Sequence, residues 1–144
     1  MPDSKETIRV LNRTPLFSGL RRNQLDRLAK RFVEREYETD QAMVTQGQGG
    51  EGFFIIVSGH AEAIRERLDG SKEKVNEFKG GDFFGELALL DDGPRTASVI
   101  ATEPTTCLVL ARWDFFSVLK EDVDTAITIL QEMAKRFRAT LEVM

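Results

Sequence analysis

One carboxylate and one guanidinium lie in an otherwise largely apolar stretch, FFGELALLDDGPRTASV, which runs from Phe83 to Val99. Gly85 precedes the segment GELALL, which predicts a short helix with Glu86 in its first turn. The start of a helix offers unpaired backbone N–H groups and the positive end of the helix dipole, which together bind anions. Arg95 follows an acidic turn and can reach the same anion, and its planar fork of donors suits a phosphate. Glu86 can then accept a hydrogen bond from a hydroxyl, and a phosphate beside a sugar hydroxyl indicates a nucleotide.

The same two residues also allow a purely structural interpretation. Glu86 could cap its own helix and form a salt bridge with Arg95. Their spacing alone favours neither interpretation.

Composition excludes several classes of protein. A chain of 144 residues has the size of one domain, and its net charge of −4 argues against broad binding to nucleic acid. No apolar run reaches the length of a membrane span, and the first residues do not resemble a signal peptide. Cys107 is the only cysteine and lies in an apolar strand, so we expect a buried, inert thiol. His60 is the only histidine, which leaves no metal site or catalytic set of His and Asp for an enzyme such as a phosphodiesterase.

The pattern of apolar residues predicts helices at both ends of the chain and strands between them. Residues 1–32 have helical spacing, with Pro15 and Gly19 at the join between two helices. Residues 33–111 contain short β-rich runs separated by turns, and Asp69-Gly70 indicates a hairpin. Residues 112–144 return to helix. We therefore expect an α+β fold, mainly β, in which an antiparallel β-roll, jelly-roll-like, is flanked by N-terminal helices and two C-terminal helices.

The C-terminal segment carries two capping signals and one apolar stripe. Asp114 is a plausible cap for FFSVL, and Asp122 opens the last helix. The stripe either packs on the domain or forms a coiled-coil seam with a second copy, and both could hold on different faces. Its members repeat at intervals of three and four residues: Ile127, Leu130, Ala134, Phe137, Leu141 and Met144.

The segment from Phe83 to Val99 resembles the phosphate-binding cassette of the cyclic nucleotide-binding domain family, with F-G-E-L-A-L followed by a turn and P-R-T-A-S-V. The segment QGQGGEGFFIIVSGHAEA resembles the family's glycine turn and strand. Similarly, PLFSGLRRNQLDRLAKRF resembles its N-terminal helical entry and RWDFFSVL the start of its B helix. The resemblance runs from about Pro15 to the end, so we expect 1–144 to be a single domain of this family.

The resemblance implies a role for each cassette residue. Glu86 would contact the ribose 2′-hydroxyl, Arg95 the exocyclic phosphate, and the amides of Ala88 and Thr96 the phosphate as well. Glu51 would orient the arginine from the glycine turn, although it is one methylene longer than the aspartate usual there. The implied ligand-binding residues are Phe84, Gly85, Glu86, Leu87, Ala88, Pro94, Arg95, Thr96 and Ala97, with Glu51 in support.

The resemblance also implies a cytoplasmic, non-enzymatic sensor of a cyclic nucleotide, which needs no metal. We expect cAMP as the tighter ligand, with cGMP also admitted, because threonine at position 96 permits both. The B and C helices would close over the base as a lid, with Leu130, Met133, Ala134 and Phe137 as candidates to meet it. Trp113 is expected to pack at the junction of roll and helix rather than on the purine. Other expected partners are a second copy, through the C-terminal helix, or an effector protein; the alternative is a structural or interaction module with another ligand or none.

Overall fold

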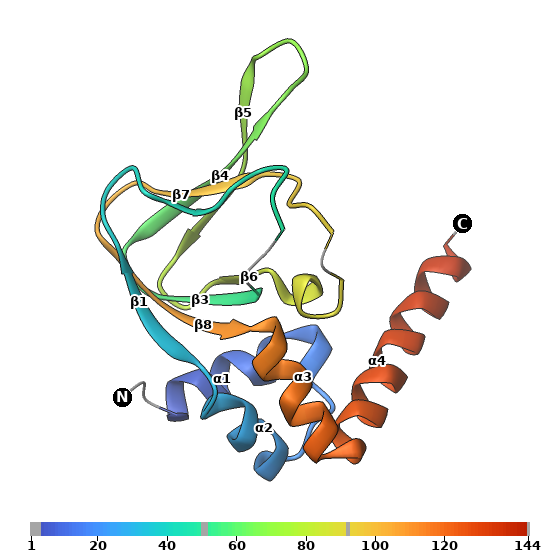
Figure 1. Cartoon of the computed structure of the whole chain (residues 1–144). Coiled ribbons are helices and arrows are strands. Elements are labelled where there is room, and N and C mark those ends of the chain that lie inside the picture. The colour runs from blue at the N-terminus through green and yellow to red at the C-terminus, as the bar shows by residue number, and fades with distance from the viewer. Residues whose placement is uncertain (1–3, 50–51, 92, 144) are drawn as a thin grey trace. The chain divides into compact units, whose positions relative to one another are not determined.

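The computed structural model describes residues 4–49, 52–91 and 93–143 (Figure 1). These residues form two compact units. One unit is Phe32–Arg112, and the other combines residues 4–31 with residues 113–143. The first unit extends one residue beyond the predicted roll, 33–111, at each end.

The first unit is built from two antiparallel sheets of four strands each. One sheet has the strand order β1-β8-β3-β6 and the other has the order β2-β7-β4-β5. The predicted antiparallel β-roll is therefore confirmed. The strands are β1 (Val33–Tyr37), β2 (Ala42–Val44), β3 (Gly52–Ser58), β4 (His60–Glu66), β5 (Lys72–Lys79), β6 (Phe83–Phe84), β7 (Ser98–Ala101) and β8 (Thr105–Ala111).

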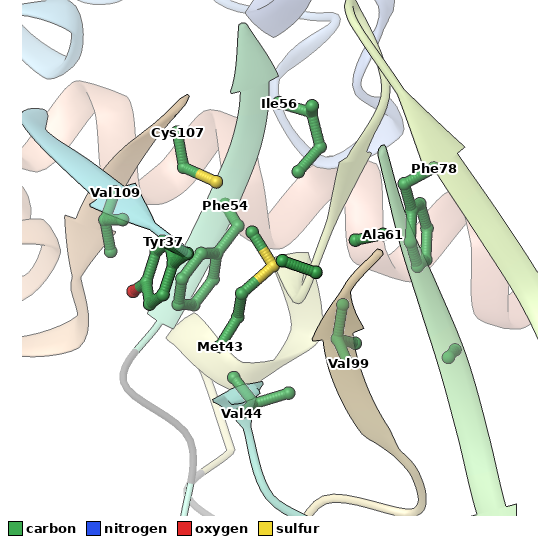
Figure 2. Close-up of a cluster of buried hydrophobic side chains, with 12 residues drawn as sticks. Tyr37, Met43, Val44, Phe54, Ile56, Ala61, Phe78, Val99, Cys107 and Val109 are labelled. Atoms are coloured by element: carbon green, nitrogen blue, oxygen red, sulfur yellow. The ribbon is translucent and has the colours of Figure 1, made fainter. Parts of the chain in front are cut away.

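Both sheets contribute alternate side chains to one buried cluster, as Figure 2 shows. In β3, Phe54 and Ile56 point into this cluster because successive side chains of a strand alternate between its faces. Facing residues from the other sheet include Ala61 of β4 and Val99 of β7. The twelve members are Tyr37, Met43, Val44, Phe54, Ile56, Ala61, Ala63, Phe78, Val99, Ala101, Cys107 and Val109.

The hairpin predicted at Asp69-Gly70 joins β4 and β5. Gly70 has a φ of 87°, a left-handed conformation that glycine adopts without strain. Asp69 closes the turn because its Oδ1 accepts a hydrogen bond from the amide of Ser71 at 2.9 Å. The hairpin prediction is confirmed.

The second unit consists of helices with a shared apolar core. Phe17 and Phe115 lie edge to face in it, with ring centroids 6.0 Å apart. Its elements are α1 (Ser4–Arg13), the 3₁₀ turn η1 (Pro15–Phe17), α2 (Arg22–Ala29), α3 (Arg112–Glu121, except its first residue, which belongs to the first unit) and α4 (Val123–Glu142). Among these described helices, none combines the length and apolar composition that a bilayer-spanning helix needs.

Asp114 does not cap α3, contrary to the expectation from sequence. The helix begins at Arg112, directly after β8 ends at Ala111, so Asp114 lies in its first turn. A carboxylate in the first turn still favours the helix dipole. Its Oδ1 lies 3.6 Å from a guanidinium nitrogen of Arg31.

Asp122 caps α4, as predicted. Its carboxylate accepts hydrogen bonds from the amide of Thr125 at 3.4 Å and from the hydroxyl of Thr125 at 2.7 Å. The hydroxyl of Thr125 is the main reason that the pKa of Asp122 lies below its ordinary value, and Arg27 adds to the effect. Arg27 Nη1 is 2.6 Å from the carboxylate, which ties α2 to the start of α4.

The apolar stripe predicted on α4 is not its buried face. The buried residues of this helix are Thr125 and Ile129. By contrast, Leu130 is 68% and Phe137 66% exposed, and Ile127, Ala134 and Leu141 are also exposed. Packing of this stripe on the domain is therefore wrong for the described residues, because three- and four-residue spacing identifies an apolar face but not the surface it covers, and the seam with a second copy stays a prediction. Met144 lies outside the described residues.

Trp113 was expected to pack at the junction of roll and helix. It is instead 73% exposed, because it lies in the first turn of α3 on the side away from the buried Phe115 and Val118.

Candidate functional site

A pocket of about 420 Å³ lies between two segments of the roll that are joined by the acidic turn. Seven of the nine ligand-binding residues named from the sequence line it. Glu86 and Arg95, the charged pair, are both among them. The full lining is Gly85, Glu86, Leu87, Ala88, Asp91, Gly93, Pro94, Arg95 and Thr96.

The pocket segment that contains Glu86 begins with a glycine in a left-handed conformation. Gly85 has a φ of 87° and is followed by the 3₁₀ turn η2 (Glu86–Leu89). The amide of Ala88 donates to the carbonyl of Gly85 at 3.0 Å, so this predicted phosphate donor is already engaged in the turn.

The predicted helix over GELALL is therefore a single 3₁₀ turn of four residues. A turn of this length aligns too few peptide dipoles to supply the helix dipole that the sequence suggested. The left-handed Gly85 at its start prevents the turn from extending toward the N-terminus. Any anion in the pocket depends on Arg95 and on local amides rather than on a helix end.

Arg95 is held by backbone groups on both sides. Its amide donates to the carbonyl of Gln48 at 2.9 Å, and its carbonyl accepts from the amide of Gly47 at 2.8 Å. The guanidinium Nη2 donates to the carbonyl of Gly52 at 2.8 Å. The side chain thus reaches from the pocket wall to the start of β3.

Gly85 permits a close approach of its own backbone, the backbone of Gly52 and the side chain of Arg95. A Cβ at this position would lie 2.4 Å from the carbonyl oxygen of Gly52 and 2.9 Å from Nη1 of Arg95. Both distances are shorter than van der Waals contact, so any side chain here would displace the guanidinium. The lack of a side chain at Gly85 therefore leaves the space that the carbonyl of Gly52 and the guanidinium of Arg95 occupy.

Thr96 presents polar groups to the pocket. No hydrogen bond within the described part of the chain involves its amide or its hydroxyl, and the residue is exposed. It follows Arg95 directly, so both groups are available beside the guanidinium.

Two predicted ligand-binding residues do not line the pocket. The ring of Phe84 stacks on Phe54 with centroids 4.8 Å apart and packs on Phe78 at 4.9 Å. Ala97 also packs against the buried cluster between the sheets. These two residues anchor the ends of the pocket segments in the core. Glu51, the predicted supporting acid, lies outside the described residues.

Three residues near the site were not named as ligand-binding from the sequence. Asp91 and Gly93 line the pocket, and the amide of Gly93 donates to Asp91 Oδ1 at 3.0 Å. Gly52 supplies the carbonyl that holds Arg95. The acidic turn and the dense glycines were visible in the sequence, but only the backbone path shows which of them face the pocket.

Cys107 and His60 do not line this pocket. Cys107 is fully buried, and burial raises the pKa of its thiol to about 12, so the thiol is neutral and a poor nucleophile. His60 Nδ1 lies 2.6 Å from the hydroxyl of Thr102, and its Nε2 lies 3.5 Å from Glu77. Within the described residues, no group of three His, Cys, Asp or Glu side chains could hold a metal ion.

A second hollow of about 770 Å³ occurs elsewhere on the roll. It is lined by Glu36, Tyr37, Glu38, Gln41, Ser58, Pro104, Thr105 and Thr106. This set has two carboxylates and no basic side chain, which does not suit an anion. The pocket that contains Arg95 is therefore the candidate site for a phosphate.

Comparison with known proteins agrees with this geometry. Residues 34–122 match the family model of the cyclic nucleotide-binding domain. The chain is 32% identical over 125 residues to the cyclic AMP receptor protein of Thermus thermophilus, covering 87% of this chain and 58% of that protein. It is 42% identical over 91 residues to the cAMP-dependent protein kinase regulatory subunit of Mycosarcoma maydis, covering 63% of this chain and 17% of that protein.

The fold also matches a solved structure, the N-terminal domain of a transcriptional regulator from Streptomyces coelicolor. The TM-score is 0.85 at 28% identity, and the match covers 94% of each chain. The two curated relatives are longer, and the match spans less than two thirds of either. The residues that match the family model, 34–122, include both sheets apart from Val33, the pocket with its charged pair and all of α3. The chain belongs to the cyclic nucleotide-binding domain family.

Proposed function

We propose that this chain is a sensor module that binds cAMP, and more weakly cGMP, in the pocket lined by Glu86 and Arg95. The observation that carries the proposal is the convergence of these two residues on one pocket. They are nine positions apart and belong to different segments. A carboxylate and a guanidinium in one small pocket match the hydroxyl and the phosphate of one nucleotide.

Arg95 binds the cyclic phosphate in this proposal. The phosphate diester carries a single negative charge, which one guanidinium neutralises. The hydrogen bond from Nη2 to the carbonyl of Gly52 leaves the side chain fixed in direction, so little rotamer entropy remains to be lost on binding. The amide of Thr96 adds a donor next to it, whereas the amide of Ala88 would have to share its hydrogen bond to Gly85.

Glu86 accepts a hydrogen bond from the ribose 2′-hydroxyl in the same proposal. It is the first residue of η2, and the left-handed Gly85 before it sets the direction in which the turn starts. A carboxylate accepts hydrogen bonds and donates none, so it favours a ribose over a 2′-deoxyribose. The names of the relatives from Thermus thermophilus and Mycosarcoma maydis support cAMP as the ligand.

Signalling through α3 and α4 is part of the proposal. A lid helix transmits a signal only if the ligand binds its closed arrangement better than its open one. Met133 is partly buried, whereas Leu130, Ala134 and Phe137 are exposed. These apolar side chains are suited to cover a purine base, and the two units would then act as one module without enzymatic activity.

Calorimetry of the whole chain against cAMP, cGMP and 5′-AMP tests the proposal. We expect cAMP to bind at one site per chain and cGMP to bind roughly ten- to hundredfold more weakly, which is about 1.4–2.8 kcal/mol. We expect 5′-AMP to bind more weakly still, because its phosphate carries a second negative charge beside Glu86. Recovery of unchanged cAMP after incubation with Mg²⁺ would agree with a sensor. Absence of heat with either cyclic nucleotide would contradict the proposal and favour a structural or interaction module.

A further inference from the structure

Gln46 lies in the turn that holds the backbone of Arg95. We call residues 45–49 the Gln46 turn; they follow β2 and include Gly47 with a φ of 84°. The amide of Gly47 donates to the carbonyl of Arg95 at 2.8 Å, and the amide of Arg95 donates to the carbonyl of Gln48 at 2.9 Å. Gly49 and Pro94 extend this contact as an antiparallel bridge. The position of Arg95 therefore depends on the position of the Gln46 turn.

The side chain of Gln46 fixes the turn to β4. Its Nε2 donates to the carbonyl of Glu66 at 2.9 Å, and its Oε1 accepts from the amide of Glu66 at 2.7 Å. The backbone amide of Gln46 donates to the hydroxyl of Ser98 at 2.8 Å. One side-chain amide thus satisfies both backbone groups of Glu66, in the same way as a residue of a neighbouring strand would.

The register of the sheet shows which residue Gln46 replaces. In the antiparallel pair of β4 and β7, Ile64 lies opposite Ser98. If β7 began two residues earlier, Thr96 would lie opposite Glu66. The amide of Gln46 occupies that place, and Thr96 is instead a pocket residue with no hydrogen bond in the described part of the chain.

We propose that Gln46 is a positioning residue for phosphate binding. By occupying the edge of β4 at Glu66, it keeps Arg95 and Thr96 out of the sheet and holds them at the pocket. This inference rests on the proposed function as far as the phosphate is concerned. Asparagine at position 46 would be too short to reach Glu66 from the same backbone. Glutamate at position 46 would lack the N–H donor that the carbonyl of Glu66 accepts from.

The first test needs no ligand. Amide hydrogen exchange is measured by NMR for Gly47 and Arg95 in the wild type, in Gln46→Ala and in the control Gln41→Ala. Gln41 is a matched control because its Oε1 also accepts a backbone hydrogen bond, from the amide of Glu38 at 2.9 Å, and it does not line the pocket. We expect Gln46→Ala to speed exchange at both amides by about tenfold, since two hydrogen bonds are lost.

Amides of β8, in the centre of its sheet, report whether the whole fold has weakened. Faster exchange at Gly47 and Arg95 with unchanged exchange at Val109 supports the proposal. Unchanged exchange at Gly47 and Arg95, or equal acceleration at Val109, overturns it.

The second test is a double-mutant cycle for cAMP binding with Gln46→Ala and Arg95→Ala. We expect Gln46→Ala to weaken cAMP about tenfold in the wild type and by much less when Arg95 is already alanine, because Gln46 acts through Arg95. Equal effects in both backgrounds would show that Gln46 does not act through Arg95 and would overturn its positioning role. If the wild type binds no cyclic nucleotide, the proposed function fails, and the exchange experiment still decides whether Gln46 holds Arg95 at the pocket.

Discussion

The guanidinium of Arg95 is hydrogen-bonded to the backbone of Gly52, with Nη2 2.8 Å from the carbonyl oxygen. Gly52 is the first residue of β3, so the start of a core strand sets the direction of a pocket side chain. The contact also brings the backbone at Gly85 close to both groups, because a Cβ there would lie 2.4 Å from the same oxygen. Gly52, Gly85 and Arg95 are therefore in mutual contact. A substitution at either glycine should change the position of the Arg95 guanidinium.

Gly85→Ala should weaken cAMP binding and destabilise the fold. The left-handed backbone alone costs an alanine about 1–3 kcal/mol, and the added Cβ would also press on Arg95 Nη1 at 2.9 Å. Gly70→Ala is the matched control: Gly70 has the same φ of 87°, and no atom lies within 4 Å of its added Cβ. Chemical denaturation of both variants measures the loss of stability from backbone strain. Calorimetry of both variants with cAMP measures the effect of the clash with Arg95 on binding.

The expected result is similar destabilisation from backbone strain in both variants, with loss of affinity only in Gly85→Ala. Equal affinities for cAMP in the two variants would show that Arg95 does not depend on the space left by Gly85.

Glu86→Ala should weaken cAMP binding and leave the affinity for 2′-deoxy-cAMP nearly unchanged. A hydrogen bond to a charged group contributes about 1.5–3 kcal/mol, so the wild type should prefer the ribose ligand by tenfold or more. Titration of both ligands into both proteins gives the four affinities. If the preference for the ribose ligand persists in Glu86→Ala, another group contacts the 2′-hydroxyl.

The thiol of Cys107 makes the fold sensitive to alkaline pH. Burial raises its pKa to about 12 from an ordinary value near 9, so between these values the unfolded chain loses a proton that the folded chain keeps. The stabilisation is complete below about pH 9, and the free energy of unfolding then falls by up to about 1.4 kcal/mol per pH unit. Denaturation at several pH values above 9 should show that the free energy of unfolding falls less steeply with pH for Cys107→Ala than for the wild type. Parallel declines would mean that the thiol is not buried in solution.

The roll could be predicted from sequence because its strands are short, rich in β-branched and aromatic residues, and separated by glycine turns. Asp69-Gly70 is a local signal, and the structure has the hairpin there. Asp122 is similarly local, because an N-cap depends on one side chain and the next few residues. Asp114 failed as a cap since β8 continues into α3 without a break, which no single residue signals.

The pocket was predictable to the extent that its residues are close in sequence. Glu86 and Arg95 could be named, but Gly52 could not, because its contact with Arg95 joins residues that are far apart in the chain. Phe84 was expected at the ligand and instead stacks on Phe54. A side chain beside a pocket residue can face either the ligand or the core, and the sequence pattern does not distinguish these directions.

The exposed stripe of α4 should promote self-association. Ile127, Leu130, Phe137 and Leu141 are between 45% and 68% exposed and repeat at helical spacing, which is typical of a face that packs on another helix. Sedimentation over a hundredfold range of concentration should show a dimer that grows with concentration. Phe137→Glu should abolish the dimer, while Glu142→Gln should not. A single monomeric species at all concentrations would leave this face without a second copy.

Arg95 holds the phosphate of a cyclic nucleotide in the proposed function, and the most direct test of this role is calorimetry of cAMP with the wild type, Arg95→Ala and Arg65→Ala. Arg65 is an exposed arginine of β4 that does not line the pocket, so it controls for the loss of one positive charge. Arg95→Ala should lose about 2–5 kcal/mol of binding free energy, the usual effect of removing one partner of a buried charged pair. Arg65→Ala should bind as the wild type does. Equal affinity of Arg95→Ala and the wild type would contradict the account, because the phosphate would then be held elsewhere.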